Sequence, residues 1–237
     1  MSSIQTRVSR VVTLPLLALR GLVVFPQTSV HFDVGREKSM AALQEAMSAD
    51  QYLFLVTQSN VEDEDPRLDQ LCLTGVVARV RQVLRMPSDT LRVMVEAEYR
   101  AQIRGVVQTD PVCLVEVKEC PTKRLTDATE ATAYRRECQA YFERYAALSG
   151  EIDETTRQRI ATCRDMTLLP DLMTDALPAP AEEKQPVLDA LTLETRIQTV
   201  LSLLANEIEI LELERGIEQR VQSNIERTSV TIICTSR

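Results

Sequence analysis

The segment between residues 14 and 38 constrains the fold most, because it is apolar enough to be buried yet is interrupted every few residues by proline, arginine or glycine. Proline removes a backbone hydrogen-bond donor and glycine permits turn conformations, so one long helix is excluded. The pieces between the interruptions are rich in β-branched and aromatic residues, which favour strands. We therefore expect three short strands, at Val11–Leu19, Leu22–Phe25 and Ser29–Val34.

The third of these strands should be half buried, because its side chains alternate between apolar and polar. The apolar face carries Val30, Phe32 and Val34, and the polar face carries Ser29, His31 and Asp33. Helical spacing follows at Met40, Leu43 and Met47, so a short amphipathic helix should end near Asp50. The dense apolar run Tyr52–Thr57 then predicts a strand that is covered on both faces.

The next segment holds the clearest hairpin pattern of the chain. An alternating run at Leu73–Leu84 is followed by turn residues at positions 86–89 and by a second alternating run at positions 91–96. Two further strands are expected at Arg100–Gln108 and Val112–Lys118. Several short strands with one helix inserted early predict an α+β fold that begins with a compact, partly closed antiparallel sheet, a pseudo-barrel.

After the β-rich part glycine nearly vanishes, and the apolar residues recur at helical spacing. A first helix should begin at a cap on Thr126 or Asp127 and end at Gly150. Its regular row of tyrosines predicts core packing rather than a platform on which nucleic-acid bases stack. A second helix should start at Asp153, and a short third one should cover Leu168–Leu177 before prolines interrupt the pattern.

The last element is a long helix expected within residues 188–227. A helix of about 35 residues would extend for ~50 Å, more than a small domain can cover. Its apolar residues form two rows, so its first half should pack on the preceding helices. Its second half should project and contact another chain through Ile210, Leu213, Ile217 and Val221. The chain thus divides into five parts: a flexible tail (1–10), a β-rich part (11–120), a helical part (121–187), a long helix (188–228) and a tail of unexplained character (229–237).

Charge and residue types argue against several classes of function. A net charge of −8 opposes binding to the phosphate backbone of nucleic acids. One histidine and six scattered cysteines form no zinc pattern and no disulfide framework, so we expect reduced thiols in a cytoplasmic protein. Four consecutive acids at residues 62–65 fit a solvated loop better than a metal site. No apolar run approaches the ~20 residues that span a bilayer, so no membrane contact is expected.

Catalytic machinery is also not expected. The two closest glycines, Gly21 and Gly35, are 14 positions apart, which excludes the glycine-rich loops that cradle phosphates. His31 stands alone on a polar strand face, so no Ser-His or Cys-His constellation can form. We therefore expect no catalytic residue, no metal and no cofactor.

The runs LALRGLVVFP and VGREK occur in an order and spacing that resemble the start of the amino-terminal domain of the bacterial Lon family of ATP-dependent proteases. Gly21 departs from the acidic residue that is usual at its position. The matching residues are Leu19, Arg20, Val23, Val24, Phe25, Pro26, Val34, Gly35, Arg36, Lys38 and Ala42. Further similar motifs lie at Gly75–Val80, Val93–Glu96, Glu182–Gln185 and Leu211–Glu214, so the resemblance covers residues 14–227.

This resemblance implies a PUA-like β-fold and a non-catalytic module that recognises unfolded or damaged polypeptides and supports assembly of a Lon hexamer. It also implies that the ATPase and the Ser-Lys protease lie in other domains. Misfolded chains display apolar side chains, so loop residues with apolar side chains are candidate substrate contacts. These are Phe25, Pro26, Met86 and Pro87, for which ordinary turn or core packing is the alternative.

Two other functions remain open on the sequence. PUA-like folds can bind RNA, and the predicted strands carry arginines that could form one basic face, namely Arg79, Arg81, Arg85, Arg92, Arg100 and Arg104. The negative net charge opposes this function. Alternatively, the long helix could make the chain a coiled-coil scaffold that associates with itself.

Overall fold

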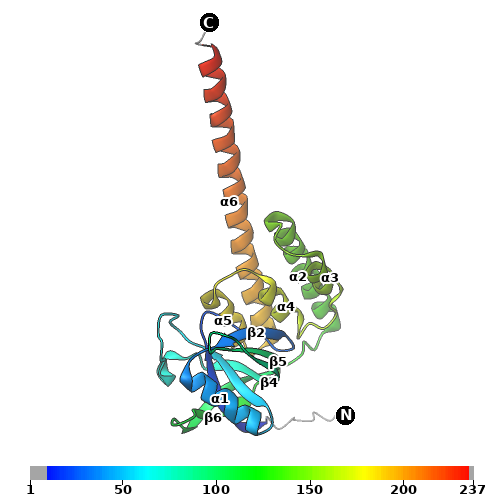
Figure 1. The fold of residues 1–237 in the computed structure, drawn as a ribbon. Helices are drawn as coiled ribbons and strands as arrows, with labels where there is room; N and C mark the ends of the chain where they lie inside the picture. The colour runs from blue at the N-terminus through cyan, green and yellow to red at the C-terminus, as the bar shows by residue number, and fades with distance from the viewer. Residues whose placement is uncertain (1–9, 235–237) are drawn as a thin grey trace.

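The computed structural model describes residues 10–234, with side chains placed as far as residue 222. Figure 1 shows a β-rich body at one end, a group of helices above it, and the long helix α6, which projects away from both. Among the residues described, no helix combines the length and the apolar character needed to cross a bilayer. The order of β-rich part, helices and long helix follows the prediction from the sequence.

Six strands form one sheet that closes on itself. They are β1 (Val11–Leu19), β2 (Ser29–Val34), β3 (Tyr52–Thr57), β4 (Thr74–Arg85), β5 (Leu91–Gln108) and β6 (Leu114–Glu119). Their order is β2-β5-β4-β3-β1-β6, and β5 also pairs with β6. The strands from β5 to β6 therefore make a closed ring, and β2 extends the sheet beside the first half of β5. This closure confirms the predicted pseudo-barrel.

The strand β5 is one continuous element of 18 residues, where the sequence predicted two separate strands. Register shifts at Val77/Ala78 and at Val80/Gln82 of the neighbouring β4 let the pair bend without a turn. A second difference is that β1 and β3 run parallel, so the sheet is mixed rather than wholly antiparallel. The intervening helix α1 (Glu37–Ser48) supplies the crossover that a parallel pair needs.

Residues 22–25 form a loop, so the strand predicted there is wrong. Their β-type composition reflects burial, since Phe25 is 0% exposed. The backbone of this loop bonds to side chains instead of to a neighbouring strand. Thr57 Oγ1 donates to the carbonyl of Leu22 over 2.9 Å, and Thr28 Oγ1 donates to the carbonyl of Phe25 over 2.7 Å. The β-type residues of this loop therefore fill the core without forming a strand.

The helices beyond the barrel begin and end largely where the sequence indicates. They are α2 (Ala128–Ser149), α3 (Glu154–Thr162), α4 (Leu169–Ala176), α5 (Ala181–Asp189) and α6 (Leu193–Cys234). Asp127 caps α2 by accepting from the backbone of Thr129, and Gly150 ends that helix with a φ of 68°. Tyr145 is 1% exposed, and the partly buried Tyr134 and Tyr141 pack against the same core, which confirms that the tyrosine row of α2 faces the core.

Two predicted boundaries near the long helix are wrong. The prolines at 178–186 were expected to interrupt all helical structure, yet α5 forms with Pro186 inside it and Pro180 at its N-cap. The long helix starts at Leu193 rather than at residue 188, because Thr192 caps it by accepting from the backbone of Thr195 over 3.2 Å. Its backbone stays helical to Cys234, through most of the predicted tail at 229–237, and positions 235–237 lie outside the described residues.

Candidate functional site

The four predicted substrate contacts occupy different environments. Phe25 is 0% exposed and Pro26 is also buried, so both are core residues and cannot serve as surface contacts in this structure. Met86 is half-buried and Pro87 is exposed at the tip of the β4–β5 hairpin, where the backbone N–H of Met86 donates to the carbonyl of Thr90. The fold therefore leaves only the hairpin tip of this set available for contact.

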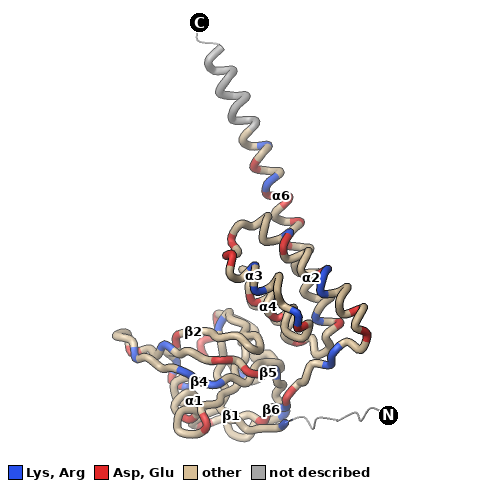
Figure 2. The backbone as a smooth tube through the Cα atoms, turned by 90° about the vertical axis from the view of Figure 1, so that its right-hand side faces the viewer, with Lys and Arg blue, Asp and Glu red and all other residues tan. Residues whose placement is uncertain are grey.

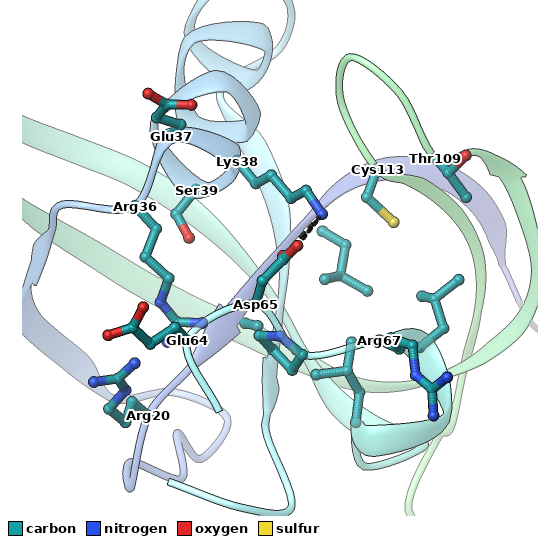
Figure 3. Close-up of a pocket in the computed structure, with 15 residues that line it drawn as sticks. Arg20, Arg36, Glu37, Lys38, Ser39, Glu64, Asp65, Arg67, Thr109 and Cys113 are labelled. Carbon is teal, nitrogen blue, oxygen red and sulfur yellow. Dashed lines mark hydrogen bonds and ion pairs between the residues drawn. The ribbon is translucent and has the colours of Figure 1, made fainter. Parts of the chain in front are cut away.

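Sequence reasoning missed a cleft of about 720 Å³ between the end of β1, the first turn of α1 and the loop that follows β3. We call it the β1–α1 cleft, and Figure 3 shows its lining. Its apolar floor consists of Leu16, Ala18, Leu68 and Leu71. Its charged rim includes Arg20, Arg36, Lys38, Glu64 and Asp65. The lining comes from segments far apart in the sequence, so no local pattern indicates it.

An ion pair crosses the cleft from α1 to the acidic loop. Lys38 Nζ donates to both carboxylate oxygens of Asp65, over 2.8 Å and 2.6 Å, and Figure 3 shows the two side chains pointing toward each other within the lining. This contact raises the pKa of Lys38. The side chains of Lys38 and Asp65 are 63% and 66% exposed, so the pair is screened by solvent and contributes little to the stability of the fold.

Two further cations of the lining, Arg20 and Arg36, bind neutral oxygens, whereas Arg67 pairs with Asp69. Arg36 Nη2 donates to Gln58 Oε1 over 2.7 Å, and Arg20 Nη2 donates to the backbone carbonyl of Asp63 over 3.3 Å. Gln58 in turn donates to that same carbonyl over 3.0 Å, which fixes the loop. Burial and, after it, the nearby charge of Arg20 lower the pKa of Arg36. The rim thus holds two guanidinium groups close enough to repel each other.

The acidic loop is exposed, as its composition indicated. Glu62, Glu64 and Asp65 are exposed, while Asp63 is half-buried because Gln70 Nε2 donates to its carboxylate over 3.0 Å. Within the described part of the chain, no three histidine, cysteine or acidic side chains lie close enough together to hold a metal ion. Residues 64–68 of the segment after β3 line one side of the cleft.

The predicted contact residues of the long helix are exposed apolar side chains. Ile210, Leu213, Ile217 and Val221 are 49%, 57%, 55% and 52% exposed. We call these four residues the stalk stripe. Just before them the same helix is buried against its neighbours, as at Leu204 with 0% exposure. Figure 1 shows α6 extending well beyond the other helices. The helix α2 still contacts α6 through the ion pair of Arg144 with Glu212 and the bond from Arg215 to the carbonyl of Leu148, so the stalk stripe begins beside α2. Its side chains are nevertheless about half exposed among the described residues.

The arginines of the predicted basic face do not form one free surface. Four of them pair with acids: Arg81 with Glu96, Arg85 with Asp89, Arg92 with Asp33, and Arg100 with Asp171. Arg79 lies over the ring of Tyr52 at 5.7 Å, and Arg100 is buried. Figure 2 shows basic and acidic residues interspersed over this part of the chain. The pairing removes the surplus charge that a nucleic-acid interface needs.

Comparison with known proteins gives a consistent result. Residues 13–206 match the family model described as the ATP-dependent protease La (LON) substrate-binding domain. A Lon protease of Brevibacillus choshinensis is 38% identical over 91% of this chain, and one of Desulforamulus reducens is 37% identical over 93% of it. The chain spans only 28% and 27% of the lengths of those two relatives.

Solved structures show the same fold. The N-terminal domain of Mycobacterium avium complex Lon protease superposes with a TM-score of 0.67 at 21% identity, covering 81% of this chain and 98% of that one. A Lon N-terminal domain protein from Xanthomonas campestris gives a TM-score of 0.54 at 12% identity, with the same coverage. At these identities the likeness concerns the fold alone.

Proposed function

Since this chain belongs to the family of ATP-dependent protease La (LON) substrate-binding domains, we propose that it is a non-catalytic module that binds unfolded or damaged polypeptides for a Lon-type protease. The matched residues include the barrel, the helical part and the base of α6. Hydrolysis of ATP and of peptide bonds would then belong to the part of the relatives that this chain does not span.

The observation that supports this proposal best is the β1–α1 cleft. Its apolar floor can accept side chains that a folded protein hides and an unfolded one displays. Its charged rim can bond to the backbone and polar groups of an extended segment. The hairpin tip at Met86 and Pro87 would add a second, adaptable apolar contact, because methionine adjusts to partners of different shape.

We further propose that the stalk stripe supports assembly of the protease hexamer. Its residues recur at intervals of three or four, so they share one face of α6 that another helix can cover. This proposal includes the coiled-coil function considered from the sequence, as one property of the same module.

We also propose that the protein is cytoplasmic. Its described cysteines are free thiols, and the cytoplasm keeps thiols reduced. They are Cys72, Cys113, Cys120, Cys138 and Cys163.

The main test is binding to a permanently unfolded protein. Reduced and carboxamidomethylated α-lactalbumin, labelled with a fluorophore, would be titrated with this chain, and native α-lactalbumin would serve as the control. We expect the unfolded form to bind and the native form not to bind. Equal affinity for both forms, or binding to neither, would contradict the proposed function.

A further inference from the structure

The β1–α1 cleft already holds a carboxylate that belongs to the chain itself. Asp65 presents both of its oxygens to Lys38 Nζ, at 2.8 Å and 2.6 Å, inside the lining of the cleft (Figure 3). This arrangement is the one that a carboxylate of a bound peptide would make with the same lysine. Asp65 therefore occupies a position that a ligand could take over.

Replacing Asp65 by a ligand carboxylate would cost the fold little. The side chains of Lys38 and Asp65 are 63% and 66% exposed, so solvent screens the attraction between their charges. Asp65 lies on the exposed loop after β3, not in a strand or helix that its movement would disturb. The freed side chain would also remain in contact with water.

The rim carries further positive charge that is not neutralised by direct ion pairs. Among the described residues, neither Arg20 nor Arg36 has a carboxylate within ion-pair distance, and their bonds go to the neutral oxygens of Asp63 and Gln58. Glu37 and Glu64 also line the cleft. Burial and then the charge of Arg20 lower the pKa of Arg36, whereas the carboxylate of Asp65 raises it. A ligand carboxylate in the place of Asp65 would therefore act on Arg36 as well as on Lys38.

Apolar surface lies within the same cleft. Leu16 and Leu71, which are 8% and 7% exposed, contribute to its floor together with Leu68 and Ala18. A ligand that reaches Lys38 with a carboxylate can therefore bury an adjacent aliphatic side chain on this floor. Neither a purely apolar nor a purely acidic segment would use both features.

We propose that the β1–α1 cleft binds polypeptide segments in which a carboxylate lies next to an aliphatic side chain, with the carboxylate replacing Asp65 on Lys38. The carboxylate can come from a free C-terminus or from an aspartate or glutamate side chain. This inference rests on the proposed function and specifies the class of substrate segment for the cleft. It makes Asp65 an internal competitor of the ligand.

Binding of short labelled peptides tests the proposal by fluorescence anisotropy. The first probe is a glycine- and serine-rich peptide that ends in Leu-Leu with a free carboxylate, and the second is the same peptide with an amidated C-terminus. The third is amidated and carries Leu-Asp-Leu internally. We expect the amidated peptide without aspartate to bind roughly tenfold more weakly than the first, as for one lost charge-assisted hydrogen bond. The third peptide decides which source of carboxylate the cleft accepts.

Substitutions in the rim give effects of opposite sign. Lys38→Met should weaken binding of the free-acid peptide roughly tenfold, because it removes the donor. Asp65→Asn should tighten binding roughly threefold, because it removes the competitor while keeping the size of the side chain. Lys123→Met, at an exposed lysine outside the cleft, is the matched control and should bind like the wild type.

Equal binding of the three peptides would overturn the proposal, and so would weaker binding by Asp65→Asn or unchanged binding by Lys38→Met. Thermal denaturation of each variant shows that the fold is retained. If unfolded α-lactalbumin still binds while these peptides do not, the proposed function stands and only the inference about the cleft fails. If neither binds, the proposed function fails as well.

Discussion

Arg100 of the barrel and Asp171 of α4 form an ion pair in the interior, with 3.0 Å between Nη2 and Oδ1 and both side chains 3% exposed. Arg196 of α6 approaches the same oxygen to 3.7 Å. The two guanidiniums also bond to the carbonyls of Leu188 and Ala190, in the segment that leads into α6. One carboxylate therefore links the barrel, the helical part and the base of the long helix.

Asp171→Asn should destabilise the chain strongly, because it leaves two buried guanidiniums without a counter-charge. Removing one partner of a buried ion pair typically costs about 3–5 kcal/mol of unfolding free energy. Urea denaturation measures the loss. The control is Asp33→Asn, which breaks the exposed pair with Arg92 and should change stability little. Similar losses of unfolding free energy in the two variants would contradict the view that the buried carboxylate of Asp171 stabilises the fold more than an exposed one.

Gly75→Ala should destabilise the barrel, since a Cβ at this position would lie 2.1 Å from the backbone oxygen of Leu55. Both groups belong to paired strands, so β3 and β4 would have to separate. Overpacking of this kind costs about 1–3 kcal/mol. Gly105→Ala is the matched control, because its Cβ would meet nothing within 4 Å. The melting temperatures of the two variants should differ clearly, and a Gly75→Ala variant as stable as the control would disprove the close approach.

Because the thiol of Cys138 is buried, we expect the free energy of unfolding to fall at alkaline pH. Cys138 is 0% exposed, and burial raises the pKa of its thiol from 9.0 to about 12. Between these values the unfolded chain has lost the proton that the folded chain keeps, so the free energy of unfolding falls as the pH rises, by up to ~1.4 kcal/mol per pH unit. Urea denaturation from about pH 8 to about pH 11 should show this slope in the wild type and a smaller one in Cys138→Ala. Parallel slopes would argue against a buried, protonated thiol.

Local patterns were enough to predict elements whose signal lies within their own residues. Three strands lie at the positions predicted for them, because alternating side chains or a dense β-type composition marks each one in the sequence. They are Val11–Leu19, Ser29–Val34 and Tyr52–Thr57. Residues 22–25 carry the same composition without a pairing partner, and they are a buried loop. A composition rich in apolar and β-branched residues therefore indicates that a segment is buried. It indicates a strand only where a neighbouring strand is available for pairing.

Features assembled from distant segments could not be predicted in this way. Arg100 was grouped with the exposed arginines, but its partner Asp171 lies 71 positions further along the chain. The β1–α1 cleft likewise depends on Lys38 of α1 meeting Asp65, which lies 27 positions away in the loop after β3. The stalk stripe was predicted because its spacing is local, and it is exposed because the helix extends beyond the body of the molecule.

The stalk stripe should drive self-association of this chain. Covering exposed apolar side chains on a helix stabilises a dimer or higher assembly, so the wild type should be oligomeric at micromolar concentration in sedimentation equilibrium. Leu213→Ser combined with Ile217→Ser should shift the chain to monomer while circular dichroism shows that the fold is retained, because these exposed side chains contribute nothing to the core. Gln219→Ser, on the opposite face of the helix, is the control and should leave the assembly intact. A monomeric wild type would rule out the stripe as an assembly surface of this chain alone.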